Sequence, residues 1–219
     1  MLPMEKAVSE IIKIGQQKHM ESFYRNGEMC FNPVEYFNKR DSNKERFDIT
    51  EGVNEIKQVE WLKIVTDDEK TYEFSNTGNN AIKLNSSILL SSFEERKGNI
   101  FSCIGINPEN RNYFRKLKRG FLEFGDTAVL ITNPKTFSDR VSAALLKNRY
   151  NFKFGYVNYL PLDTMNGKWS VFLKPTHFQH QSEIRIWVKT ELKEKLVIKI
   201  GSIKDISKIF SIRSSKTKY

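Results

Sequence analysis

The chain has 219 residues, with 36 basic and 26 acidic side chains and a formal net charge of +10. Hydrophobic residues make up 39% of it and aromatic residues 12%, which is enough apolar material for one substantial core and excludes a disordered polar chain. No segment approaches the ~18 consecutive apolar residues that span a bilayer, and the first residues lack the pattern of a secretion signal. We therefore expect one globular domain over residues 1–219 and a cytoplasmic location.

The excess of positive charge favours nucleic acid, either RNA or DNA, as a partner, because polyanions are attracted to a basic surface. A basic composition also arises without such a partner, for example where a genome is rich in A and T. Cys30 and Cys103 lie among hydrophobic neighbours in expected strands. Both are predicted to be buried free thiols, as is usual in the cytosol.

The first elements are predicted to be a strand, a short helix and a second strand. Residues 7–15 end in an apolar alternation typical of a strand. Residues 17–26 carry apolar side chains at helical spacing and stop at Gly27, a residue suited to the left-handed position after a helix. Residues 28–31 follow as the second strand.

The middle of the chain is predicted to be mostly strand, with turn residues at 66–69 that indicate a β-hairpin. The expected strands span residues 55–65, 70–74, 82–90, 99–106 and 126–132. A clear helix is predicted over 134–147, because Asn133 can cap it and Pro134 fits the first helical position.

The last third is predicted to be strands over 152–160, 169–173, 183–188 and 196–200, followed by a short helix over 203–209. Strands and helices do not alternate regularly enough for a doubly wound parallel sheet. The expected fold class is therefore α+β, with mostly antiparallel sheets, few helices and a basic tail over about residues 211–219.

The sequence His177-Phe178-Gln179-His180-Gln181-Ser182-Glu183-Ile184-Arg185-Ile186-Trp187-Val188 reads as the opening of a strand with one apolar face. Because strand side chains alternate, Gln181 and Glu183 are expected to share the polar face. A Gln-x-Glu pair opening a strand resembles the signature of mono-ADP-ribosyltransferases. The resemblance implies that Glu183 holds the 2′-hydroxyl of the nicotinamide ribose of NAD⁺ and that Gln181 orients the acceptor. The alternative is that both are solvated residues of a half-buried strand.

A second resemblance covers nearly the whole chain in order. Its motifs are His19-Met20-Glu21-Ser22, Gly27-Glu28, Asn32-Pro33, Tyr36-Phe37, Arg46-x-Asp48, Glu51-Gly52, Phe124-Gly125-Asp126, Phe137-x-x-Arg140-Val141, Gln181-x-Glu183-x-Arg185 and Ile200-Gly201-Ser202. They resemble a widespread bacterial and phage family that we connect with ADP-ribosyltransferase-like folds and with toxin or phage-conflict roles. The resemblance implies NAD as a substrate, and a toxin role would bring an antitoxin or regulator as a partner.

The same resemblance implies a set of NAD-binding residues. The first strand offers only Lys13 where the transferases have Arg or His, so His19 would take that place. Tyr36 and Phe37 could stack on nicotinamide, although aromatic residues after a strand are also common in cores. Arg46, Asp48 and Glu51 could order a loop over the nucleotide or contact its phosphates through Arg46, and the alternative is a solvated connector.

A basic helix is expected around residues 111–119, with aromatic residues beside the charges. Its cations, which suit phosphate contact, are Arg111, Arg115, Lys118 and Arg119. The alternative is a solvated helix face.

The sequence thus predicts an NAD-dependent ADP-ribosyltransferase that acts on a nucleic acid or on a protein associated with one. One alternative is a binding module of the same fold without catalysis, favoured by the missing first-strand Arg or His and the missing Ser-Thr-Ser motif. The other is a metal-independent nuclease that uses His177 and His180 with a lysine. No metal site is expected, because these two residues and His19 are the only imidazoles and the cysteines are expected to be buried.

Overall fold

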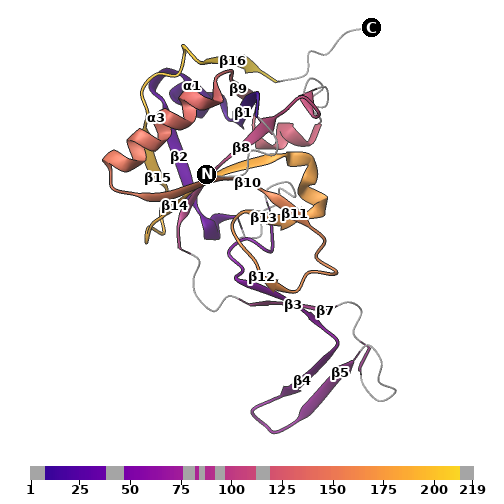
Figure 1. Ribbon diagram of the computed structural model, residues 1–219. Helices are drawn as coiled ribbons and strands as arrows, with labels where there is room; N and C mark the ends of the chain where they lie inside the picture. The colour runs from indigo at the N-terminus through magenta and orange to yellow at the C-terminus, as the bar shows by residue number, and fades with distance from the viewer. Residues whose placement is uncertain are drawn as a thin grey trace.

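The computed structural model describes residues 8–37, 47–75, 82–83, 87–91, 97–111 and 119–212. These residues form an α+β fold with few helices and mostly antiparallel sheets, as predicted from the sequence (Figure 1).

The main sheet has eight strands, six of which follow one another in the order β10, β14, β8, β1, β9 and β16, and every neighbouring pair of these six is antiparallel. Their bounds are Asn151–Tyr156 for β10, Glu183–Lys189 for β14, Asn99–Ile106 for β8, Glu10–Gly15 for β1, Thr127–Ile131 for β9 and Ser207–Ser211 for β16. A further strand, β2 (Glu28–Pro33), pairs with the start of β8 and with β15 (Leu196–Lys199). Strands β1, β8 and β14 thus lie side by side in the middle of the sheet, where they can share one site.

Two helices pack against this sheet. Helix α1 (Gln17–Asn26) ends at Gly27, which adopts the left-handed conformation and donates its N–H to the carbonyl of Phe23. Helix α3 (Pro134–Lys147) begins at Asn133, whose side chain accepts a hydrogen bond from the N–H of Thr136. None of the helices in the described part of the chain is long and apolar enough to cross a membrane.

The largest core joins both helices to the sheet through aromatic rings. Phe23 of α1 lies 5.7 Å from Phe101 of β8 and 6.1 Å from Phe137 of α3, between ring centroids. Phe31 of β2 lies 5.3 Å from Phe101 in the same way. All four rings are buried. Ring pairs at such distances add to the stabilisation from burial itself, so they fix α1 against β2 and β8.

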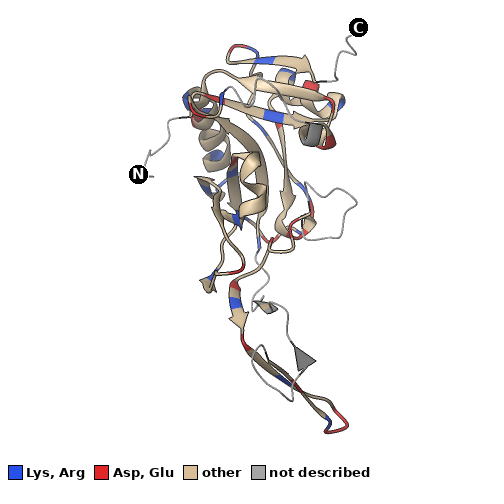
Figure 2. Cartoon of the chain, turned by 90° about the vertical axis from the view of Figure 1, so that its right-hand side faces the viewer, with Lys and Arg blue, Asp and Glu red and all other residues tan. Residues whose placement is uncertain are grey.

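Smaller sheets extend the fold away from this core. Strand β3 (Glu55–Val59) pairs with β7 (Ser87–Ser91) and β12 (Gly167–Lys168), and β11 (Asn158–Leu160) pairs in parallel with β13 (Leu173–Pro175). The predicted hairpin is confirmed in part: β4 (Trp61–Val65) and β5 (Thr71–Ser75) pair antiparallel, and β6 (Ile82–Lys83) joins β5. The single strand expected over 55–65 is instead divided into β3 and β4, which belong to different sheets. Figures 1 and 2 show this hairpin projecting from the rest of the molecule. Three 3₁₀ helices within the described ranges, η1 (Val34–Tyr36), η2 (Arg119–Phe124) and η3 (Thr176–Gln181), complete the elements used below.

Two secondary-structure predictions in the last third of the chain are wrong. Residues 203–209 are not a helix, because Ile203 and Ile206 enter the core from a turn and the chain continues as β16, which pairs with β9. Trp169 begins no strand but is buried beside Val53 and Ile56.

Cys30, expected to be buried, is exposed, because its neighbours Met29 and Phe31 take the core side of β2. Cys103 is buried as predicted. The tail beyond residue 212 and residues 112–118 of the expected basic helix lie outside the described residues.

Candidate functional site

A cavity of about 380 Å³ lies beside the middle of the main sheet. Residues of β1, α1, β2, η1, β8, η2 and β14 line it, together with Glu51, Lys174, Gln181 and Lys195. Ligand sites in proteins usually have volumes of ~300–1,000 Å³, so this cavity can hold a small molecule or part of a larger one.

A buried charge network forms one wall of the cavity, with Arg185 of β14 at its centre. The guanidinium holds Glu51 by two hydrogen bonds, of 3.0 Å from Nη1 and 2.7 Å from Nη2. Its Nε donates to Glu183 over 2.7 Å, and Nη1 also donates to the carbonyl of Val171. The carboxylates of Glu51 and Glu183, which are 132 positions apart in the sequence, therefore share one cation. This cation fixes both carboxylates at the cavity wall.

Lys174 adds a second cation and joins the two residues of the Gln-x-Glu motif. Its Nζ lies 2.8 Å from Oε2 of Glu183 and donates to Oε1 of Gln181 over 2.9 Å. The backbone N–H of Glu183 donates to the hydroxyl of Tyr159 over 2.8 Å. The Glu183 carboxylate is thus held from both sides by cations.

The local backbone departs from the predicted strand at the start of this motif. Gln181 ends η3, Ser182 adopts a left-handed conformation with φ of 45°, and β14 begins only at Glu183. The expectation that Gln181 and Glu183 share a strand face is therefore wrong. The turn is held because Ser182 accepts hydrogen bonds from the N–H of Gly105 and from Asn110. The two side chains still meet, through Lys174.

The charges of the network set the protonation of its carboxylates. Burial alone would raise the pKa of Glu183, but the charges of Arg185 and Lys174 and their hydrogen bonds outweigh it, so the net effect is a lowered pKa. Burial raises the pKa of Glu51, and the opposing effect of Arg185 does not offset it, in part because Asp48 is close. Burial also raises the pKa of the Cys103 thiol to about 12. Glu183 is consequently the carboxylate that stays ionised most firmly, and Cys103 is no thiolate nucleophile.

Most residues that the sequence nominated for NAD binding lie on the cavity. His19 of α1 and the neighbouring pair Tyr36 and Phe37 line it, and Tyr36 is 41% exposed. The rings of Tyr36 and Phe37 meet edge to face with centroids 5.4 Å apart. Lys13, from the first strand, lies on the same cavity, donates to the carbonyl of Ser102 over 2.6 Å and sits 4.4 Å from the centroid of Phe101.

Asp48 does not line the cavity, whereas Glu51 of the same turn does. Its buried carboxylate accepts hydrogen bonds from the N–H of Thr50 over 2.9 Å and from the Thr50 hydroxyl over 2.6 Å. The N–H of Glu51 donates to the carbonyl of Asp48. Asp48 therefore shapes the turn that presents Glu51 to Arg185. Arg46 lies outside the described residues.

Of the four cations predicted to contact nucleic acid, the structure describes only those at the two ends of the basic segment, Arg111 and the backbone of Arg119. Arg111 pairs with Glu10 over 3.2 Å at the surface. Arg115 and Lys118, and the side chain of Arg119, lie outside the described part.

His177 and His180 of η3 do not line the cavity. Nδ1 of His180 lies 2.9 Å from the carbonyl oxygen of His177, and the His177 ring lies tilted against Phe178 with ring centroids 4.1 Å apart. His180 also lies beside Phe121 of η2, with ring centroids 6.4 Å apart. Within the described ranges no group of three or more His, Cys, Asp or Glu could hold a metal ion.

The sequence-based prediction gave Lys174 and Arg185 no role in the site, and it placed Glu51 in the polar connector without pairing it with Arg185. The sequence did contain a signal for Lys174, because it has the apolar residues Leu173 and Pro175 on its two sides. A charged side chain in such a run is either solvated or paired with an opposite charge. No protein-family model, curated protein or solved structure matches the chain.

Proposed function

We propose that the cavity binds NAD⁺ and that the protein is a mono-ADP-ribosyltransferase whose acceptor is a nucleic acid or a protein bound to one. The observation that carries the proposal is that His19 and Tyr36, from the start of the chain, line one cavity with Gln181 and Glu183, from near its end. The same convergence supports the roles that the family resemblance gives them.

The side chains around the cavity suit the parts of a dinucleotide. The exposed ring of Tyr36 offers a face for nicotinamide. Lys13, Lys195 and His19 lie on the same cavity and can face ribose or phosphate oxygens. Glu183, held in its ionised form, provides an acceptor for the ribose 2′-hydroxyl.

The proposed chemistry breaks one bond and forms one. The bond between the ring nitrogen of nicotinamide and C1′ of ribose breaks, nicotinamide leaves with the electron pair, and the ribose develops a positive charge like that in glycoside cleavage. A preorganised carboxylate beside C1′ stabilises that charge, which is the role of Glu183. The acceptor then bonds to C1′ through a lone pair and gives its proton to solvent. Lys174, which holds both Gln181 and Glu183, positions the acceptor-orienting amide beside the carboxylate.

A non-catalytic binding module is the second candidate, and one observation favours it. Glu183 is 6% exposed and accepts charge-assisted hydrogen bonds from Arg185 and Lys174, which reduces the negative charge that it presents to the cavity. A carboxylate with that environment also serves to hold strands together.

A labelling experiment separates the candidates. The purified protein is incubated with NAD⁺ labelled in its ADP-ribose part, and nicotinamide release and label transfer to RNA, DNA and protein are followed for wild type, Glu183→Gln and His19→Ala. We expect Glu183→Gln to lose at least ~10²-fold in release, the scale of one deleted electrostatic contact. We expect His19→Ala to weaken NAD⁺ binding about tenfold, which corresponds to one contact of ~1.4 kcal/mol.

The controls separate a lost contact from a lost fold. Glu191→Gln removes an exposed carboxylate that pairs with Lys97 on the surface and should leave release unchanged. His19 lies at an exposed position of α1 outside the charge network, so His19→Ala reports on the cavity even if Glu183→Gln lowers stability. Nucleic-acid binding without nicotinamide release would favour the module, and strand cleavage without NAD⁺ would favour the nuclease.

A further inference from the structure

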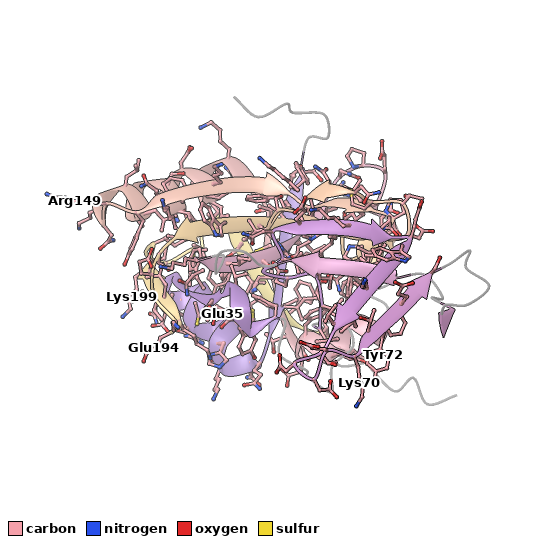
Figure 3. All side chains as sticks on the ribbon, turned by 90° about the horizontal axis from the view of Figure 1, so that it is seen from below. Glu35, Lys70, Tyr72, Arg149, Glu194 and Lys199 are labelled. Carbon is pink, nitrogen blue, oxygen red and sulfur yellow. The ribbon has the colours of Figure 1, made fainter. Side chains whose placement is uncertain are left out.

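The projecting hairpin, which we call the arm (Trp61–Ser75), presents apolar side chains to solvent. The register pairs Leu62 with Phe74 and Ile64 with Tyr72, so these four side chains share one face. Ile64 and Tyr72 are 42% and 43% exposed, and on the opposite face Trp61 and Val65 are 55% and 61% exposed. Figure 3, seen from below, labels Tyr72 and Lys70 of the arm.

The arm has little of its own to hold it in shape. All five residues of β4 are exposed, and β4 pairs with β5 alone among the described strands. The third strand, β6, has two residues and reaches only Phe74 and Ser75 at the base of the arm. A two-stranded hairpin in water is marginal, and a contiguous apolar surface on a monomer usually marks an interface. Another surface is therefore expected to cover the arm.

The charge of the arm indicates what kind of surface that is. The arm together with the preceding Glu60 (residues 60–75) contains five acidic side chains and two basic ones, a net charge of −3. Since the whole chain has a net charge of +10, the remainder carries +13. The turn residues Asp67, Asp68 and Glu69 place acidic groups at the tip, where Figure 2 shows red. A negative arm repels nucleic acid and anionic lipid and is attracted to a basic protein surface.

We propose that the arm binds a second copy of this chain, so that the arm of each protomer lies on the basic body of the other. A two-fold arrangement makes this exchange reciprocal, covers the apolar face Leu62, Ile64, Tyr72 and Phe74 twice, and sets each acidic tip against positive charge. Antiparallel pairing of the full length of one β4 with the β4 of the other copy is disfavoured, because that register would place Lys63 opposite Lys63.

Sedimentation velocity of the full chain between about 1 and 100 μM tests this arrangement, over the micromolar range in which moderate protein interfaces form. The wild type should dimerise, with weaker association as salt is raised. Ile64→Ser with Tyr72→Ser should raise the dissociation constant at least tenfold, since two exposed apolar side chains at the interface are lost. Glu60→Lys with Asp67→Lys, which changes the net charge of residues 60–75 from −3 to +1, should also raise the dissociation constant and remove its salt dependence.

The matched control is Leu146→Ser with Leu192→Ser, which removes two exposed leucines away from the arm, 65% and 47% exposed, and should leave the dissociation constant unchanged. Circular dichroism checks that each variant keeps its fold. A wild type that stays monomeric at every concentration overturns the proposal, as does a dimer that neither arm variant weakens. If the wild type is monomeric and Ile64→Ser with Tyr72→Ser instead abolishes binding of a labelled RNA, the arm contacts nucleic acid and the second copy is ruled out as its occupant.

Discussion

The residue on which the site depends most is Arg185, because its fully buried guanidinium holds two carboxylates and a backbone carbonyl at once. A buried charge is costly unless it is paired and hydrogen-bonded. Glu51 and Glu183 both supply that pairing, and Lys174 balances the second negative charge. The network is thus neutral as a group, with two cations and two anions, and each member depends on the others.

Arg185→Lys should be strongly destabilising although it keeps the charge. A lysine offers a point charge and cannot hold Glu51 by two bonds while also reaching Glu183 and Val171. We expect the free energy of unfolding to fall by about 3–5 kcal/mol, the usual cost of breaking a buried ion pair. Urea denaturation measures it, with Lys189→Arg at an exposed position as the control. A loss below about 1 kcal/mol, typical of a solvated pair, would contradict the burial of the network.

Glu183→Gln should change how stability depends on pH. The pKa of Glu183 is lowered in the fold, so its ion pairs stabilise the protein above the unfolded value of ~4.3, and that stabilisation is lost as the pH falls through the folded pKa. The raised pKa of Glu51 acts with the opposite sign, because its charge costs stability above the unfolded value and the cost disappears on protonation. Wild type should therefore lose more stability than Glu183→Gln between pH 7 and pH 3.

Urea denaturation at pH 7, 5 and 3 compares wild type with Glu183→Gln and with the surface control Glu191→Gln, which should follow wild type. If the curves for wild type and Glu183→Gln run parallel across this range, Glu183 is not held in its ionised form by the network. The same measurements give the free energy of unfolding that Glu183→Gln loses relative to wild type at pH 7, which we expect to be about 3 kcal/mol.

At the level of elements, the connection between α1 and β2 is fixed by a close approach of two backbones. Gly27 has φ of 61°, and a Cβ built on it would lie 1.9 Å from the carbonyl oxygen of Gly201. Ile200 donates its N–H to the carbonyl of Gly27 over 3.1 Å. The turn after α1 is therefore held against the segment after β15, and only glycine fits at position 27.

Gly27→Ala and Gly201→Ala form a matched pair that separates backbone strain from crowding. Both glycines have positive φ, but no atom lies within 4 Å of a Cβ at Gly201. Gly201→Ala should cost about 1–2 kcal/mol for its left-handed conformation, and Gly27→Ala should cost about 2 kcal/mol more because neighbouring backbone must shift. Thermal or urea denaturation measures both; equal losses would show that Gly27 and Gly201 do not meet.

The elements also show how far local sequence carries a prediction. Helix α3 and strand β8 were predicted with the bounds that the structure has, because Asn133 and Pro134 are local signals and β8 is an apolar run. The prediction of a helix over 203–209 is wrong because Ile203, Ile206 and Ile209 have helical spacing in the sequence. The hydrogen bonds that decide the conformation come from the distant strand β9. The pairing of Glu51 with Arg185 has no local signal, since it depends on how distant segments meet.

For the whole molecule, the surplus of positive charge is the property that bears on nucleic acid. If the basic segment contacts phosphates, changing Arg111, Arg115, Lys118 and Arg119 to Ser should flatten the log-log dependence of duplex DNA affinity on salt by roughly three to four units. Fluorescence anisotropy at several salt concentrations measures the slope. The control changes four exposed cations elsewhere, Lys147, Arg149, Lys153 and Lys189, to Ser. Equal effects of the two variants would indicate a general attraction with no defined surface.

The span of the Glu51–Arg185 pair also sets when the site can exist during synthesis. The two residues are 134 positions apart in the sequence. Lys174, Gln181 and Glu183 lie in the eleven positions that precede Arg185, so they are also made late. At ~5–20 residues per second, a ribosome needs roughly 7–27 s to make the intervening chain. Until then Glu51 has no counter-ion from β14, and the cavity lacks its charged wall. Any activity of this cavity therefore begins only after most of the chain has left the ribosome, so a truncated product that ends before β14 would be inert.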